Sequence, residues 1–193
     1  APALPRVTDL AGTADGKSVT LAWSAPSEGQ EPVETLESFE NATPFVIDRV
    51  EGWTFVDRDG KTTFGIEGAS FPNNGKPMAY MVIDRKHAAF QGEFTPRSGD
   101  RCLVSFNADD SSVNDNWAIS PLLNGKPQTI RFAAKAQTNA YGYEAFEFLY
   151  STIGTDPDSF IKAGDDKRVG AEWKEYSFDV PQGAKYFAIR CVS

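Results

Sequence analysis

The feature that most constrains this chain is a succession of short strand-like segments, separated by turn residues about every 10–15 positions. Many short strands joined by turns are typical of a β-sandwich or a β-barrel. No segment shows the apolar spacing of a helix of three turns. The sequence therefore predicts an all-β domain. From residue 52 onward we expect strands at 52–57, 62–66, 78–83, 101–106, 117–121, 129–135, 145–150, 173–180 and 185–191.

Two of the connecting segments have specific turn chemistry. Asp156 followed by Pro157 predicts a short helical turn, with Asp156 as the cap and Pro157 in the first helical position. Residues 57–60 predict a hairpin turn in which Gly60 adopts a positive φ. Their Asp-Arg-Asp-Gly pattern also resembles the start of an EF-hand loop, but the twelfth position is Gly68 where that loop needs a glutamate.

The first part of the chain predicts a separate element. Residues 1–28 contain two alternating segments, 7–11 and 18–23, around a glycine-bearing turn, and so predict a β-hairpin. Two strands alone cannot bury a core. Residues 29–35 are polar, with glycine, proline and acidic side chains, and predict a linker. We therefore place the main domain at residues 36–193.

Composition limits the functions that the chain can have. It has 193 residues, a formal charge of −8 and a pI near 4.7. That charge argues against binding to nucleic acid, which requires a basic face, and against binding to anionic lipid. No apolar run approaches the roughly 20 residues of a membrane span, so we expect no membrane insertion. The proline-rich start is no signal peptide, so we expect a mature product or an excised piece.

Cysteine and histidine are scarce. Cys102 and Cys191 are far apart in sequence, and they are consistent either with one disulfide in an exported protein or with two buried thiols. No Cys/His cluster predicts a zinc site. The single histidine, His87, rules out mechanisms that need two histidines.

The densest group of oxygen-bearing side chains lies in residues 107–116. Ten residues carry three carboxylates, several side-chain amides and two hydroxyls, and a loop that folds back could offer six or more oxygens to Ca²⁺. The alternative is an ordinary polar loop, because Asp, Asn and Ser favour turns. We predict Asp109, Asp110 and Asp115 as calcium ligands. Asp115 is the first of these because the strand that follows fixes its backbone.

A second acidic pair lies at the predicted start of the domain. Glu37 and Glu40 flank Phe39, and in an extended strand Glu37 and Phe39 would share one face while Glu40 lies on the other. We predict Glu40, and less strongly Glu37, as ligands of a calcium ion at the rim. The alternative is a pair of solvated acids at the start of a strand.

Aromatic residues suggest a ligand surface. Tyr141 and Tyr143 alternate with a glycine and could form a flat platform for the apolar face of a sugar, or simply lie at a strand edge. We expect Trp53, Trp117 and Trp173 in the core, because aromatic side chains bury large areas. A glycosidase would need two carboxylates about 5–9.5 Å apart across a cleft, and no hydrolase motif is present.

Several motifs together resemble a known family. They are Leu36-Glu37-Ser38-Phe39-Glu40, Gly52-Trp53 through Asp59-Gly60, Asp115-Asn116-Trp117-Ala118-Ile119-Ser120-Pro121, Ser151-Thr152 and Lys185-Tyr186-Phe187-Ala188-Ile189-Arg190. In order and spacing they resemble the cleaved adhesin domain, the module repeated in the haemagglutinin/adhesin regions of the gingipains. The resemblance covers residues 36–191. The preceding hairpin resembles the first two strands of a fibronectin type III module, with Trp23 as its core tryptophan.

The resemblance implies a jelly-roll β-sandwich and a non-catalytic role. It implies export to the cell surface, structural calcium, and attachment to host extracellular or erythrocyte proteins. It also allows contact with other modules of the same polypeptide. We therefore expect a calcium-stabilised adhesin or haemagglutinin module. The alternative is a carbohydrate-binding module of a larger extracellular enzyme, which would bind glycans through Tyr141 and Tyr143.

Overall fold

A computed structural model describes residues 8–24, 34–88 and 95–193. Contacts along the chain divide it into two compact units, Ala1–Glu37 and Ser38–Ser193. In the described residues, every regular element is a β-strand except for one short 3-10 helix. The all-β prediction is confirmed.

The first unit contains a two-stranded antiparallel hairpin. Strand β1 (Thr8–Asp15) pairs with β2 (Ser18–Ser24) around a turn at residues 16–17, so the turn is tighter than the sequence predicts. Trp23 is 57% exposed, because two strands provide no second layer to cover it. The expectation of a core tryptophan is therefore not met within this hairpin. Residues 1–7 and 25–33, including most of the predicted linker, lie outside the described residues.

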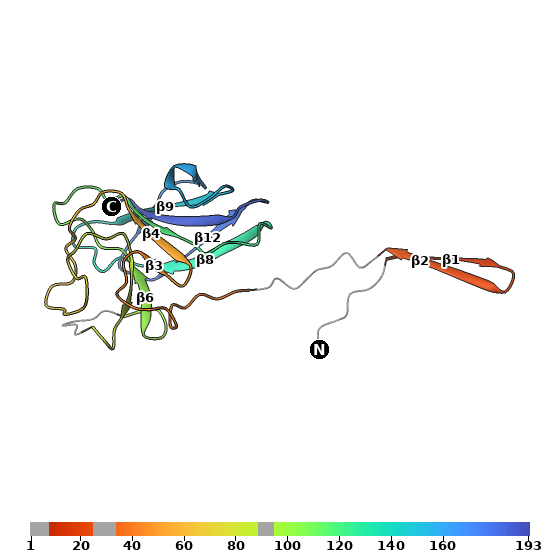
Figure 1. The fold of residues 1–193 in the computed structure, drawn as a ribbon, viewed down its shortest axis with the longest axis horizontal. Helices are drawn as coiled ribbons and strands as arrows, with labels where there is room; N and C mark the ends of the chain where they lie inside the picture. The colour runs from red at the N-terminus through yellow and green to blue at the C-terminus, as the bar shows by residue number, and fades with distance from the viewer. Residues whose placement is uncertain (1–7, 25–33, 89–94) are drawn as a thin grey trace. The chain divides into compact units, whose positions relative to one another are not determined.

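The second unit is built on a seven-stranded antiparallel sheet. Figure 1 labels three of its strands, β3, β4 and β9. Six strands follow the order β10-β9-β13-β7-β4-β3, and β11 also pairs with β9. Their bounds are β3 (Arg49–Val50), β4 (Trp53–Asp57), β7 (Asn116–Ile119), β9 (Glu144–Ser151), β10 (Ile161–Lys162), β11 (Lys167–Val169) and β13 (Tyr186–Cys191).

Two smaller sheets complete the sandwich. Strand β5 (Met81–Asp84) pairs with β6 (Arg101–Val104), and β8 (Gln128–Ala134) pairs with β12 (Lys174–Val180). The 3-10 helix η1 (Pro157–Ser159) follows Asp156, whose side chain accepts the N–H of Asp158. The predicted helical turn and its cap are confirmed.

Successive side chains of a strand point to opposite faces of the sheet, and in the large sheet this places a row of apolar side chains on the inner face. Register aligns Phe55, Ala118, Ile189 and Phe148 across four neighbouring strands. Phe148 is 1% exposed and stacks on Phe178 of β12 at 4.1 Å between ring centroids. Full burial of such a side chain contributes about 2–3 kcal/mol to folding. The smaller sheets therefore cover this face, as a jelly-roll sandwich requires.

The opposite face of the large sheet has its own apolar cluster. Trp117, Ile119, Leu149 and Ala188 pack together there, and Phe160, which follows η1, contacts Trp117 edge-on at 5.7 Å. Phe160, at the end of η1, therefore covers part of the face that is opposite the smaller sheets.

Two expectations about individual segments are wrong. The segment 62–66 forms no strand and makes only an isolated bridge from Thr63 to Ala108, because Gly65 turns the chain at a φ of 60°. Trp173 is 36% exposed and does not enter the core, whereas Trp53 and Trp117 are buried as expected. Trp173 directly precedes β12, where no second layer covers it.

Candidate functional site

Glu40 lies in a turn that opens the second unit, not in the extended strand that the sequence predicts. Phe39 has a φ of 61° and packs against the core near Trp53. The Glu40 Oε1 atom accepts the backbone N–H groups of Asp100 and Arg101, each at 2.9 Å. Two backbone donors therefore satisfy one oxygen of this carboxylate. Glu37 is exposed and belongs to the first unit.

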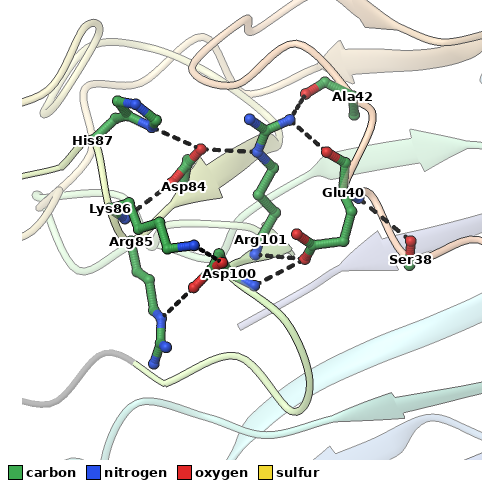
Figure 2. Close-up of polar contacts among 9 residues, drawn as sticks. All are labelled: Ser38, Glu40, Ala42, Asp84, Arg85, Lys86, His87, Asp100 and Arg101. Atoms are coloured by element: carbon green, nitrogen blue, oxygen red, sulfur yellow. Dashed lines mark hydrogen bonds and ion pairs between the residues drawn. The ribbon is translucent and has the colours of Figure 1, made fainter.

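Arg101, at the start of β6, is the centre of the contacts around Glu40 (Figure 2). Its Nη1 atom donates to the carbonyl oxygens of Glu40 at 2.7 Å and Ala42 at 2.8 Å. Its Nε atom donates to Asp84 Oδ2 at 2.8 Å. One guanidinium thus joins the opening turn, the end of β5 and the start of β6. We refer to Glu40, Ala42, Asp84 and Arg101 as the Arg101 cluster.

Asp84 is the buried charge of this cluster. It also accepts the backbone N–H of Lys86 and contacts His87 Nδ1, each at 2.9 Å. Burial opposes ionisation, but the hydrogen bonds from His87, Arg101 and Lys86 outweigh it and lower the pKa of Asp84 to about 2. The side chain is therefore a carboxylate at neutral pH.

Asp115 is also paired with an arginine. Its Oδ1 atom accepts hydrogen bonds from Arg190 Nε at 2.7 Å and from Trp117 Nε1 at 2.6 Å. The Nη1 atom of Arg190 donates a further hydrogen bond to Glu147 Oε2 at 2.9 Å. Burial works against ionisation here too, but the Arg190 and Trp117 contacts prevail and lower the pKa of Asp115. From the sequence, we expect the following strand to fix the backbone of Asp115. In the structure, the side chains of Arg190 and Trp117 also hold its carboxylate.

The other two predicted ligands lie in the exposed part of the same loop. Asp109 Oδ2 accepts the Thr62 hydroxyl at 2.8 Å, and Asp110 accepts the Ser112 N–H at 3.0 Å with Lys61 Nζ at 3.6 Å. Asn114 is buried and organises the loop base, because its side chain bonds to the Ala108 N–H and to Asn107. From the sequence, the Asn114 amide counts only as one of the oxygen-bearing groups of the loop, and its role in organising the loop base was not predicted.

These contacts describe the surroundings of the predicted calcium ligands. Calcium takes six to eight oxygen ligands, usually with several carboxylates. Across residues 8–24, 34–88 and 95–193, no three His, Cys, Asp or Glu side chains come together in a way that could hold a metal ion. One oxygen of each carboxylate accepts protein hydrogen bonds, Glu40 Oε1 from two backbone N–H groups and Asp115 Oδ1 from Arg190 and Trp117. Calcium binding by Glu40 and Asp115 stays a prediction. Asp109 and Asp110 remain open to solvent.

One of the two predicted tyrosines lines a shallow hollow in the surface. Tyr143 lines a space of about 310 Å³, whereas Tyr141 is 97% exposed and is not among the lining residues. The other lining residues are Asn139, Arg168, Gly170, Ala171, Glu172, Trp173 and Lys174. We call this space the Tyr143 hollow.

Aromatic rings and cations define the Tyr143 hollow. Lys135 Nζ lies 5.6 Å from the Trp173 ring. Gly170 lies so close to Tyr143 that a Cβ atom there would be 3.2 Å from the tyrosine ring. Asn139 Oδ1 accepts the Ala171 N–H at 2.8 Å and fixes the floor. Sequence reasoning missed Trp173 and Arg168 as members, although a tryptophan between two charged residues was a signal of exposure.

The two cysteines are free thiols, which favours the second of the two alternatives. Cys191 is buried and lies 3.6 Å from Asn114 Nδ2. Burial raises the pKa of Cys102 to about 12, so this thiol is not a nucleophile at neutral pH.

Comparison with known proteins places this geometry in context. Hemagglutinin A of Porphyromonas gingivalis is 29% identical over 213 aligned positions, which cover 95% of this chain and 8% of the relative. Lys-gingipain of the same species is 28% identical over 215 positions, which cover 95% of this chain and 11% of the relative. The K2 cleaved adhesin domain of Lys-gingipain has a TM-score of 0.59 at 18% identity, with coverage of 81% of this chain and 88% of that domain.

The homologues of this chain are gingipain and Hemagglutinin A adhesin regions, and its fold is that of a cleaved adhesin domain. The K1 cleaved adhesin domain matches more loosely, with a TM-score of 0.51 at 20% identity. No protein-family model matches the chain. The chain spans about a tenth of the length of the curated relatives that it matches.

The resemblance drawn from the sequence motifs is therefore confirmed. Residues 116–119 form β7, which lies between β13 and β4 in the large sheet. No helix in the described part of the chain has the length and apolar character needed to cross a membrane.

Proposed function

We propose that this chain is a non-catalytic adhesin module of a secreted or cell-surface bacterial protein, and that it attaches to host extracellular or erythrocyte proteins. The observation that carries the proposal is the relation to Hemagglutinin A over 95% of the chain. The cleaved adhesin fold supports it, because a rigid sandwich can present loops and strand ends as a binding surface.

The Tyr143 hollow is the surface that we propose for attachment. It combines Tyr143, Trp173 and Arg168, the residue types that most often dominate the energetics of protein interfaces. Two cations, Arg168 and Lys174, and one acid, Glu172, line it, and Lys135 lies against the Trp173 ring, on a chain whose formal charge is −8. The surface therefore suits a partner with an acidic or aromatic contact.

Binding by the full chain to erythrocytes and to surfaces coated with plasma or matrix proteins tests this proposal. Trp173→Ala and Tyr143→Ala should each weaken binding about tenfold or more, as expected for central aromatic contacts. Phe64→Ala is the matched control, since Phe64 is an exposed aromatic that does not line the hollow. Absence of binding by the unmodified chain would overturn the function, whereas equal binding by all three variants would overturn only the surface.

A glycan-binding role is the second candidate, and one observation favours it. Tyr143 and Trp173 line the same hollow as the Asn139 amide, which is the combination of flat apolar face and polar group that a sugar ring requires. A glycan array distinguishes the candidates. Specific glycan binding that Tyr143→Ala and Trp173→Ala abolish supports a carbohydrate-binding module. Tyr141→Ala tests the predicted platform, because loss of binding in that variant would extend the site beyond the hollow.

We also propose that calcium orders the exposed part of the loop at residues 107–116. Asp109 and Asp110 are the ligands that we propose, together with neighbouring carbonyl and hydroxyl oxygens. Bound calcium would neutralise these two carboxylates and restrict the loop. The melting temperature of the chain should rise with calcium and fall with chelator, and the double variant Asp109→Asn/Asp110→Asn should remove the difference. A calcium response that survives this double variant would contradict the assignment.

A further inference from the structure

We propose that the Arg101 guanidinium takes the place of a bound cation at the start of the sandwich, so that the Arg101 cluster needs no calcium. Three oxygens from separate parts of the chain converge on this side chain: the Glu40 and Ala42 carbonyls and Asp84 Oδ2, at 2.7–2.8 Å (Figure 2). Carbonyl and carboxylate oxygens are the ligands that hard cations bind in proteins.

Arg101 neutralises the buried charge of Asp84 without a metal ion. Asp84 contributes one buried negative charge, and Arg101, with a side chain that is 22% exposed, contributes the matching positive charge. The Glu40 carboxylate turns to the backbone N–H groups of Asp100 and Arg101. A divalent ion would have to displace the guanidinium and leave it largely buried without these acceptors, which is unfavourable.

Arg101 connects distant parts of the chain, as a structural metal ion does. Arg101 connects residues that are 59, 61 and 17 positions away along the chain. It therefore holds together the turn that starts the unit and one end of the β5–β6 pair. The planar guanidinium has several donors in fixed directions, so it can satisfy carbonyls and a carboxylate at the same time.

Removal of the side chain should expose the oxygens to an added cation. We choose Arg101→Ala in the Asp109→Asn/Asp110→Asn background, because that background removes the calcium site proposed above. The background chain should melt at the same temperature with calcium or chelator. The Arg101→Ala variant should melt roughly 5–15 °C lower, as expected when one partner of a buried ion pair is lost. Millimolar calcium or methylguanidinium should then restore part of that loss.

The conservative variant Arg101→Lys provides the matched control. Lysine retains a positive charge but has no planar fork, so this variant should lose less stability and should not respond to calcium. Failure of Arg101→Ala to respond to either added cation would show that Arg101 forms an ordinary ion pair, and would overturn the proposal.

A measurement on folded protein covers the case in which Arg101→Ala does not fold. Calcium titration by calorimetry compares the background chain with the same chain carrying Glu40→Gln. We expect no calcium binding by either protein. Binding that Glu40→Gln weakens would place calcium at the Arg101 cluster and overturn the proposal. It would leave the adhesin function untouched, because that function depends on the separate binding assays.

Discussion

Asp84 is the single carboxylate whose ionisation should affect stability most directly. Its folded pKa of about 2 lies below the ordinary 3.8, so the folded state binds this proton less readily than the unfolded state does. The resulting stabilisation is fully present above about pH 5, and it is lost as the pH falls through the folded pKa. A difference of this size corresponds to about 2 kcal/mol.

Urea unfolding of the wild type and of Asp84→Asn across this pH range tests the prediction. Other carboxylates also have lowered pKa values, so the difference between the two proteins is the relevant quantity. We expect Asp84→Asn to be the less stable protein at neutral pH, with the gap closing between about pH 4 and pH 2. Parallel curves for the two proteins would contradict the assignment.

Cys102 should react slowly in the folded protein. Burial raises its pKa from 9.0 to about 12, so the thiolate fraction at mildly alkaline pH falls roughly 1000-fold. Alkylation by iodoacetamide, followed by mass spectrometry of the peptides, should label Cys102 readily in urea and hardly at all under native conditions. Equal labelling rates in the two conditions would show that the thiol is accessible and unperturbed.

The sequence predicts where charged side chains cluster, but it does not predict which ion pairs they form. The sequence placed Asp115 correctly against a strand, yet its partner Arg190 lies 75 positions away. Strand alternation predicts which face a side chain takes, whereas the partner depends on how strands are ordered in the sheet. An arginine within the otherwise apolar run of residues 186–191 was the available signal for a paired charge.

At the scale of elements, the turns around the Arg101 cluster depend on backbone conformations that few residues tolerate. Gly99 has a φ of 64°, and a Cβ atom there would lie 2.3 Å from Glu40 Oε1. Both the dihedral angle and the contact favour glycine at this position.

Gly99→Ala should therefore destabilise the chain by about 1–3 kcal/mol, through backbone strain and displacement of the Glu40 carboxylate. Gly183→Ala is a matched control, since Gly183 has a φ of 86° but nothing within 4 Å of an added Cβ atom. Thermal melting of the two variants separates strain from contact. An equal loss in both would mean that Glu40 is not constrained by Gly99.

Strands of four or more residues could be predicted from the sequence, and those of two or three residues could not. Strands β8, β9, β12 and β13 coincide closely with segments of alternating apolar residues. Strands β10 and β11 have two and three residues, and they exist because each pairs with β9. Local patterns carry no information about such pairing. The expected strand at 62–66 fails for the same reason, since only Thr63 finds a partner.

At the scale of the whole molecule, the core of the second unit consists of contacts within Ser38–Ser193. We predict that residues 38–193 fold alone, and that this fragment melts within a few degrees of the full chain. Differential scanning calorimetry of both proteins tests this. A fragment that is unfolded, or that melts far below the full chain, would show that the hairpin segment belongs to the cooperative unit. The predicted boundary after residue 35 would then be wrong.

The positions of the four tryptophans give this chain a built-in fluorescence reporter. Trp53 and Trp117 are buried, whereas Trp23 and Trp173 are partly open to water and belong to different units. Acrylamide should quench the second pair first, while the blue-shifted emission of the first pair follows unfolding of the sandwich. Replacing Trp23 by phenylalanine would leave Trp173 as the main quenchable indole, so ligand capture in the Tyr143 hollow becomes visible without any label.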